Sequence, residues 1–245
     1  MAYIVRAFLV CLFTGFIAAP IAFPQSLSGV PSPVIRTDDR QAEWRIGFDP
    51  GNDGAQSRTS SRLHYQHGFG SRLRVRGIVV GSNSGPGGFD LTQTQVQTLF
   101  QYADAADGGI NAAFRFDYLL SNGNDNPDDV RFGWTGDWPL APKWTFRTSA
   151  FASVEVGNNR NDGAFLETRA ALIRRFRGGH SFHLQSFQLY GFTSDLPGFN
   201  GQNHALGPSV SLKLSDRWRA TTSAIFGISD AATDTTIRLF LGYQF

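Results

Sequence analysis

Apolar and polar side chains alternate with a period of two from Ala42 to the last residue, Phe245. In the stretch that begins at Ala42, every second residue is apolar, and glutamate, arginine and glycine stand between them. Successive side chains of a β-strand point to opposite faces, so this alternation predicts strands with one apolar and one polar face. Ten segments show it clearly, and two more, near residues 62–69 and 181–192, show it less regularly. The sequence therefore predicts twelve strands and an all-β fold.

The segment 181–192 does not keep a single phase. Phe182 and Leu184 fall out of step with Phe187 and Leu189. A β-bulge near Gln185 would account for the change, because one extra residue moves all later side chains to the other face. The pattern does not fix which face these residues occupy.

The N-terminus has the layout of a secretory signal peptide. Arg6 is followed by an apolar run over residues 7–17, and then by small residues around Ala19 and Ala22. A helical membrane anchor is the alternative. The run is shorter than the ~20 apolar residues that a membrane helix needs, and Pro20 ends it.

This layout divides the chain into three parts. We expect residues 1–22 to be a signal peptide, residues 23–41 an extended periplasmic lead-in, and residues 42–245 a barrel in the cell outer membrane. The lead-in contains three prolines and several serines and has no apolar core of its own. The sole cysteine, Cys11, lies in the predicted signal peptide, so we expect no disulfide in the exported chain.

The connections between the predicted strands alternate in length. Short turns are expected near residues 68–70, 139–142, 177–179 and 215–216, with a slightly longer one at residues 103–109. The longer, more polar connections are residues 51–59, 81–90, 121–129, 157–163, 194–203 and 229–234. Short turns at one end and longer loops at the other are typical of an up-and-down membrane barrel.

Tryptophans gather at the end where the short turns lie. With both termini at that end, Trp44, Trp144 and Trp218 begin strands there, and Trp138 ends one. Aromatic side chains form such girdles where a barrel crosses a membrane–water interface. This position favours a barrel with an apolar outer face over a soluble, lipocalin-like carrier, the alternative fold with the same periodicity.

The last strand gives the sharpest signal. Apolar side chains alternate to the very end of the chain, at Leu239, Leu241, Tyr243 and Phe245. In this ending the sequence resembles bacterial outer-membrane β-barrel proteins, which are porin-like and finish on a strand with a terminal aromatic residue. The resemblance implies an antiparallel transmembrane barrel with short periplasmic turns and longer extracellular loops. It also implies that these four residues are read by the barrel-assembly machinery.

The polar face of the predicted strands is rich in arginine, although the net charge of the chain is only +2. In a membrane barrel this face lines the lumen. Rings of arginine lower the barrier that anions meet when they enter a pore. The sequence therefore predicts a passive channel for small polar or anionic solutes, with lumen-lining candidates Arg74, Arg76, Arg115, Arg147, Arg169 and Arg238.

Three other functions stay open. Inward arginines and acids could pair and seal the lumen, which would make a plugged barrel with a structural or surface-binding role. Inward Phe151, Phe165 and Phe240 are the only support for uptake of hydrophobic compounds. An outer-membrane hydrolase of lipid or peptide could use Ser181 with His183, or Asp195 with His204, but no complete catalytic group is evident.

The sequence contains no cluster of metal-ligand spacing, no phosphate-binding glycine loop and no basic patch of the kind that binds nucleic acid. We therefore expect no cofactor, no metal and no nucleic-acid partner. The expected partners are outer-membrane lipid, the barrel-assembly machinery and small solutes. The pattern leaves the identity of the solute and the oligomeric state undetermined.

Overall fold

The computed structural model describes residues 27–51, 56–83, 88–107, 109–123 and 126–245. The predicted signal peptide, residues 1–22, lies outside these ranges. Over the described residues, no helix is long and apolar enough to cross a membrane.

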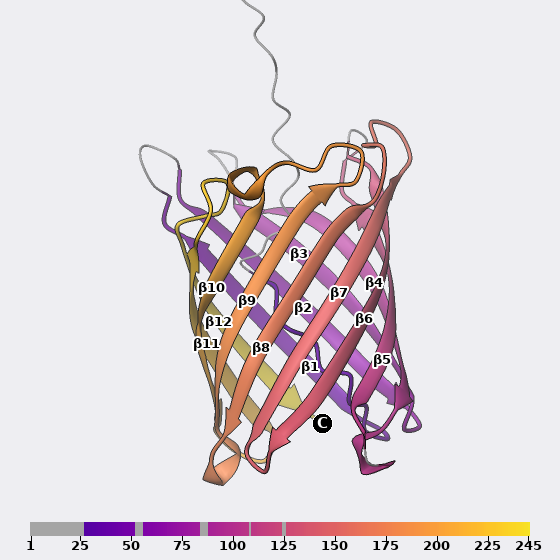
Figure 1. The fold of residues 1–245 in the computed structure, drawn as a ribbon, viewed down its shortest axis with the longest axis vertical. Coiled ribbons are helices and arrows are strands. Elements are labelled where there is room, and N and C mark those ends of the chain that lie inside the picture. The colour runs from indigo at the N-terminus through magenta and orange to yellow at the C-terminus, as the bar shows by residue number, and fades with distance from the viewer. Residues whose placement is uncertain (1–26, 52–55, 84–87, 108, 124–125) are drawn as a thin grey trace, which may run out of the picture.

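Twelve antiparallel strands form one closed barrel, in which each strand pairs with its neighbours in sequence and β12 pairs with β1 (Figure 1). The strands are β1 (Arg40–Asp49), β2 (Arg58–Phe69), β3 (Leu73–Asn83), β4 (Asp90–Ala103), β5 (Asn111–Ser121), β6 (Asp128–Ala141), β7 (Trp144–Val156), β8 (Phe165–Arg175), β9 (Ser181–Phe192), β10 (Asn203–Lys213), β11 (Trp218–Gly227) and β12 (Thr235–Gln244). The prediction of twelve strands in an up-and-down barrel is confirmed.

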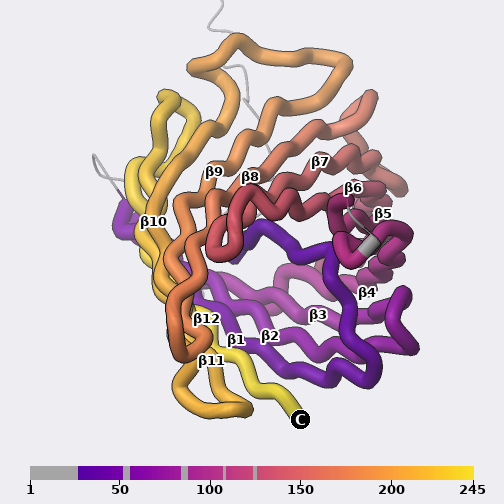
Figure 2. The backbone as a smooth tube through the Cα atoms, turned by 60° about the horizontal axis from the view of Figure 1, so that its bottom comes forward, coloured from indigo at the N-terminus to yellow at the C-terminus, as the bar shows by residue number. Residues whose placement is uncertain are grey.

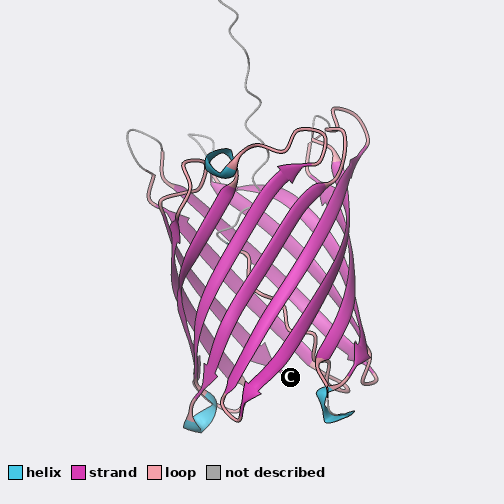
Figure 3. Cartoon of the chain, viewed as in Figure 1, coloured by secondary structure: helices cyan, strands magenta, loops and turns pink. Residues whose placement is uncertain are grey.

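The two ends of the barrel differ in their connections (Figure 3). At the end where the C-terminus lies, which we call the turn end, the strands are joined by short segments such as residues 70–72 and 142–143. At the opposite loop end the connections are longer, for example residues 157–164 and 193–202. This asymmetry is the one that the sequence predicts.

Strand β5 shows which face of the barrel the apolar and the polar residues occupy. Phe114 and Phe116 are exposed on the outside of the barrel, whereas Arg115 and Asp117 between them are buried inside. A soluble barrel would have the opposite arrangement, with apolar side chains inside. The outside therefore presents an apolar band to its surroundings, and the lipocalin-like alternative is excluded.

Aromatic rings meet one another near the turn end. Trp218 contacts Tyr243 with a centroid distance of 4.8 Å, and Tyr243 contacts Phe245 at 5.0 Å. The ring of Phe245 also lies 6.0 Å from that of Tyr65 on β2. The last residue of the chain is thus tied into an aromatic group that spans the seam where β12 meets β1 and β2.

The expected bulge near Gln185 is wrong. Strand β9 keeps one phase against β10 from Ser181 to Leu189, and the only register shift against β8 lies further on, opposite Leu166 and Glu167. Phe187 and Leu189 are simply apolar residues on the inner face. Phe187 is fully buried, and the guanidinium of Arg238 lies 4.9 Å from its ring centroid. A cation over an aromatic face stabilises that ring inside a polar lumen.

The sequence predicts an extended periplasmic lead-in but not its path relative to the barrel. The described part of the lead-in, residues 27–39, runs inside the barrel toward the turn end (Figures 1 and 2). There the chain reverses, with a hydrogen bond from Asp39 N to Arg36 O and with Asp38 at a φ of 55°. Gly68 of β2 permits the close approach, since a Cβ at this position would lie 2.5 Å from Arg36 O.

The apolar outer face generates a test in lipid vesicles. Val96 lies near the middle of β4 and is 50% exposed, whereas Leu214 follows β10 at the turn end and is 59% exposed. We expect Val96→Arg to lower the free energy of unfolding by ~2–4 kcal/mol and Leu214→Arg by at most ~1 kcal/mol, because the cost of a charge depends on its depth in the bilayer.

Urea titration of refolded protein, read by the gel-mobility shift of the intact barrel, measures both values. Equal effects of the two substitutions would contradict the placement of the outer face in lipid.

Candidate functional site: an arginine-lined lumen

The inner wall carries arginines because every second residue of each strand faces the lumen. Several of these arginines stand two residues from an acid on the same strand, so both side chains share the inner face. Such pairs are Arg45 with Glu43 on β1, Arg115 with Asp117 on β5 and Arg169 with Glu167 on β8. A fourth pair crosses strands: Arg147 of β7 lies directly opposite Asp137 of β6, with an N–O distance of 2.6 Å.

A second group of hydrogen bonds joins the wall to the lead-in. Arginines on five strands donate to backbone carbonyl oxygens of the segment that crosses the lumen. The bonds run from Arg45 to Leu27 (2.9 Å), from Arg238 to Ser28 (2.6 Å), from Arg169 to Gly29 (2.8 Å), from Arg147 to Val30 (3.4 Å), and from Arg74 to Ser32 (3.2 Å) and Val34 (3.4 Å). Buried backbone carbonyl oxygens require hydrogen-bond donors, and the barrel wall supplies them to the lead-in.

Apolar side chains of the lead-in dock into small clusters on the same wall. Leu27 packs with Ile78 and Val80 of β3. Ile35 packs with Leu99 and Ala113. These contacts, and the hydrogen bond from Ile35 N to the side chain of Gln101 at 2.8 Å, fix the depth of the segment in the lumen.

Val30 makes a third contact. It packs against Phe187, Ala205 and Ile225 on β9, β10 and β11. The lead-in therefore touches opposite sides of the barrel and does not lie along one strand only.

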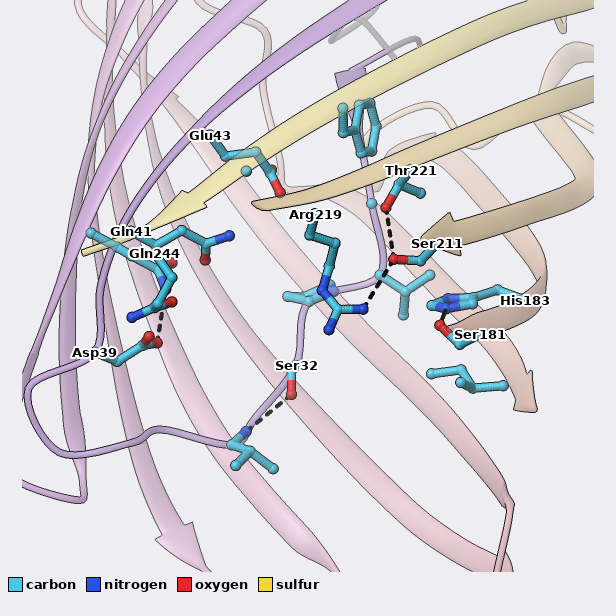
Figure 4. A pocket seen from close by; sticks show the side chains of 18 of the residues that line it. Ser32, Asp39, Gln41, Glu43, Ser181, His183, Ser211, Arg219, Thr221 and Gln244 are labelled. Carbon is cyan, nitrogen blue, oxygen red and sulfur yellow. Dashed lines mark hydrogen bonds between the residues drawn. The ribbon is translucent and has the colours of Figure 1, made fainter. Parts of the chain in front are cut away.

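The lead-in leaves two open spaces toward the turn end. The larger, which we call the vestibule, has a volume of about 590 Å³ and is lined by residues of the lead-in and by inner-face residues of β1 to β3 and β5 to β12. The smaller has a volume of about 360 Å³ and lies between the lead-in and β5 to β7. Figure 4 shows Glu43 and Arg219 pointing into the vestibule from β1 and β11.

The predicted lumen residues all lie on the inner face. Arg74, Arg76, Arg115, Arg147 and Arg169 line the vestibule. Arg238 is 1% exposed and donates to Ser28 of the lead-in and to the side chains of Ser223 and Gln185. Their part in solute passage stays a prediction.

The sequence did not predict that backbone carbonyl oxygens of the lead-in accept hydrogen bonds from the wall arginines. Carbonyl oxygens carry no sequence signal, and the lead-in offered only its prolines and lack of polar–apolar alternation. It also left Arg45 and Arg62 out of the candidate set, although both face the vestibule. Their position on the inner face was readable from the same alternation.

The residues of the hydrolase alternative do not form a complete catalytic group. Ser181 Oγ and His183 Nε2 are 2.8 Å apart in the vestibule (Figure 4), but over the described residues no carboxylate hydrogen-bonds to His183. His204 Nε2 hydrogen-bonds with Gln202, and its ring stacks on Phe199 at 4.5 Å. The pairing of His204 with Asp195, which the hydrolase alternative would use, is not formed within the described part of the chain.

The aromatic residues of the hydrophobic-uptake alternative do not form a continuous apolar path. The ring of Phe240 lies under Arg45, with the guanidinium carbon 4.4 Å from its centroid. Phe151 is covered in the same way by Arg115 and Arg169, each at 5.0 Å. Phe165 instead contacts Phe192 at 5.3 Å.

The proposed assembly signal lies at the seam of the barrel. Leu239 and Leu241 pair with Ile46 and Trp44 of β1, and Tyr243 pairs with Ala42. Phe245 N donates to the carbonyl of Arg40 at 3.0 Å. The reading of these residues by an assembly machinery stays a prediction.

The buried pair of Arg115 and Asp117 generates a stability test. Both side chains are almost fully buried, and Arg115 donates to both carboxylate oxygens. We expect Asp117→Asn to lower the free energy of unfolding by ~3 kcal/mol, because it leaves a buried guanidinium without its counter-charge.

Asp216→Asn is the matched control for urea titration. Asp216 is fully exposed in the turn after β10, where Lys213 donates to it at 2.6 Å and lowers its pKa. An exposed pair of this kind contributes little, so we expect no measurable change. Equal effects of the two substitutions would contradict the structural role of the buried pair.

The geometry matches known barrels. The fold is similar to an outer membrane channel from Pseudomonas putida F1, with a TM-score of 0.67 and 9% identity over 91% of this chain and 98% of that one. It is similar to the KdgM porin in complex with disordered oligogalacturonate, with a TM-score of 0.63 and 11% identity over 84% and 99% of the two chains. It is also similar to the NanC porin, with a TM-score of 0.59 and 8% identity over 85% of this chain and 99% of that one.

At such low sequence identity, these structural similarities show the fold alone. No curated protein matches the sequence. A family profile does match, from residue 29 to residue 245, so it covers the barrel and most of the described lead-in. The chain belongs to the family described as "Putative MetA-pathway of phenol degradation".

Proposed function

We propose that this protein is an outer-membrane channel through which small polar or anionic solutes diffuse. The observation that carries the proposal is the inner wall, where arginines of β1, β3, β5, β7, β8 and β12 face one lumen. Fixed positive charge in a wall of low dielectric constant attracts anions and lowers their barrier to passage. A closed barrel with an apolar outer face supports a position of this wall across a membrane.

The location in the outer membrane is supported by three features. The outer face is apolar, aromatic rings gather at the turn end, and the sequence begins with the layout of an export signal. Similar folds occur in proteins described as porins and as an outer membrane channel. The lipid of the outer membrane and the assembly machinery are the partners that this location entails.

The family description guides the choice of solute. It names phenol degradation, and one similar porin was solved with oligogalacturonate. Phenolic compounds and small organic acids are therefore the first solutes to test. An anionic product of aromatic breakdown would be complementary in charge to the arginine wall.

A plugged barrel is the second candidate, because the lead-in crosses the lumen and is held by hydrogen bonds to five arginines. The two functions differ in one physical respect. A channel requires the lead-in to move, or solutes to pass beside it through the vestibule, whereas a plugged barrel requires neither.

Ion selectivity tests the channel. In a planar bilayer with a salt gradient, we expect a reversal potential that shows anion preference. Arg219 lines the vestibule and points toward Ser211, so Arg219→Glu is expected to lower the ratio of anion to cation permeability several-fold.

The control for this measurement is Arg174→Glu. Arg174 lies at the same end of the barrel, and its guanidinium packs on Trp144 and Phe176 instead of lining the vestibule. It is expected to leave the ratio unchanged. Cation preference in the unmodified protein would overturn the proposed function.

A crosslink tests whether the lead-in moves. Val30 packs on the cluster that contains Ala205, so Val30→Cys with Ala205→Cys can be joined by a disulfide or by a short thiol-reactive crosslinker. If the lead-in leaves the lumen during conduction, the crosslinked protein is expected to conduct at least ~10-fold less than the reduced protein.

The other outcomes separate the two candidates. Equal currents in both forms would show that solutes pass beside a fixed lead-in. No current in either form would overturn the channel and favour the plugged barrel.

A further inference from the structure

The wall formed by β1, β2 and β3 carries more positive charge than its own acids balance. Arg62 of β2 lies directly opposite Arg45 of β1, on the same inner face. Arg74 and Arg76 stand two residues apart on β3 and therefore share that face as well. Like charges that face each other across strands destabilise a sheet.

Few acids offset these four arginines. Neither β2 nor β3 contains an acidic residue. Glu43 of β1 is already bound to Arg45, with His64 of β2 at 3.6 Å on the same carboxylate oxygen. Asp39 of the lead-in accepts a hydrogen bond from Gln66 at 3.0 Å. Both carboxylates therefore already have partners.

The hydrogen bonds of Arg62 and Arg76 leave donor capacity unused in the described part of the chain. Arg76 donates through Nε and one terminal nitrogen to a single neutral acceptor, Gln66 Oε1. Arg62 Nε is buried and makes no hydrogen bond within the part of the chain that the structure describes. A buried charged donor without an acceptor is costly, so this arrangement is complementary to an anion.

There is room for that anion. Arg62, Arg74 and Arg76 all line the vestibule, whose volume of about 590 Å³ lies in the range of small-molecule sites. The vestibule is also lined by two partly exposed apolar side chains of the lead-in, Val30 and Val34. It therefore offers a charged wall for an acid group and apolar contacts for a small organic body.

We propose that the vestibule binds a small organic carboxylate through the guanidinium groups of Arg62 and Arg76. The planar fork of a guanidinium matches the two oxygens of a carboxylate and donates to both at once. The neighbouring arginines already donate single hydrogen bonds to carbonyl oxygens of the lead-in, at Leu27 from Arg45 and at Ser32 from Arg74. The inference rests on the proposed channel function, since the site lies on the solute path.

Binding to the full-length protein in detergent micelles tests the site without a membrane. The probes are benzoate, its neutral isostere benzamide, and inorganic phosphate, each titrated by calorimetry at low salt. Benzoate is expected to bind saturably, and benzamide and phosphate at least ~10-fold more weakly, because the site selects a planar anion with an apolar body.

Substitutions test whether benzoate binds to the arginines of β2 and β3. Arg62→Gln with Arg76→Gln is expected to weaken benzoate binding at least ~10-fold, and Arg62→Lys to weaken it less, since it keeps the charge but loses the fork. Arg174→Gln removes one charge outside the vestibule and is expected to leave binding unchanged. The gel-mobility shift of the intact barrel confirms that each variant is folded.

Three results would overturn the site. These are equal binding of benzoate and benzamide, equal binding of benzoate and phosphate, or an unchanged affinity in the double variant. The channel can fail separately. Benzoate binding without current in a bilayer would support the carboxylate site and contradict the channel. Anion-selective current without benzoate binding would support the channel and contradict the site.

Discussion

The closure of the backbone hydrogen-bond network sets the rest of this structure. A membrane interior offers no water to an unpaired N–H or C=O, so a sheet in lipid must have no free edge. Pairing of β12 with β1 removes the edge and divides the side chains into an outer and an inner set. The outer set must be apolar, and the charge that the strands carry is forced into one lumen. The arginine wall follows from this division.

The lumen accommodates that charge in three ways. Carboxylates pair with some guanidiniums, as Asp117 does with Arg115. Aromatic faces take others, as Phe187 does for Arg238. The lead-in supplies the third kind of partner, a row of backbone carbonyls that accept from arginines around the barrel. On the wall of β1 to β3 these partners do not suffice, and the unused donors there point to a bound anion.

The architecture could be predicted from the sequence because alternation, turn length and the terminal aromatic residue are all local signals. Twelve strands, the inverted faces and the inward arginines were accessible in this way. Two features were not. The phase of β9 stayed undetermined because Phe187 breaks the alternation set by Phe182 and Leu184, and the sequence does not show that a cation in the lumen covers its ring. The path of the lead-in was not predicted, because the lead-in binds the wall arginines through its own backbone carbonyl oxygens, which every residue has.

The lead-in also has a consequence for how the molecule is made. It continues directly into β1, and β1 forms one side of the seam at which the first and last strands meet. A segment inside a closed ring must either be in place before that ring shuts or be threaded through it afterwards. If it is in place first, arginines from β3, β7, β8 and β12 can gather around it while the sheet curls. The lead-in would then be a template around which the strands of the barrel assemble.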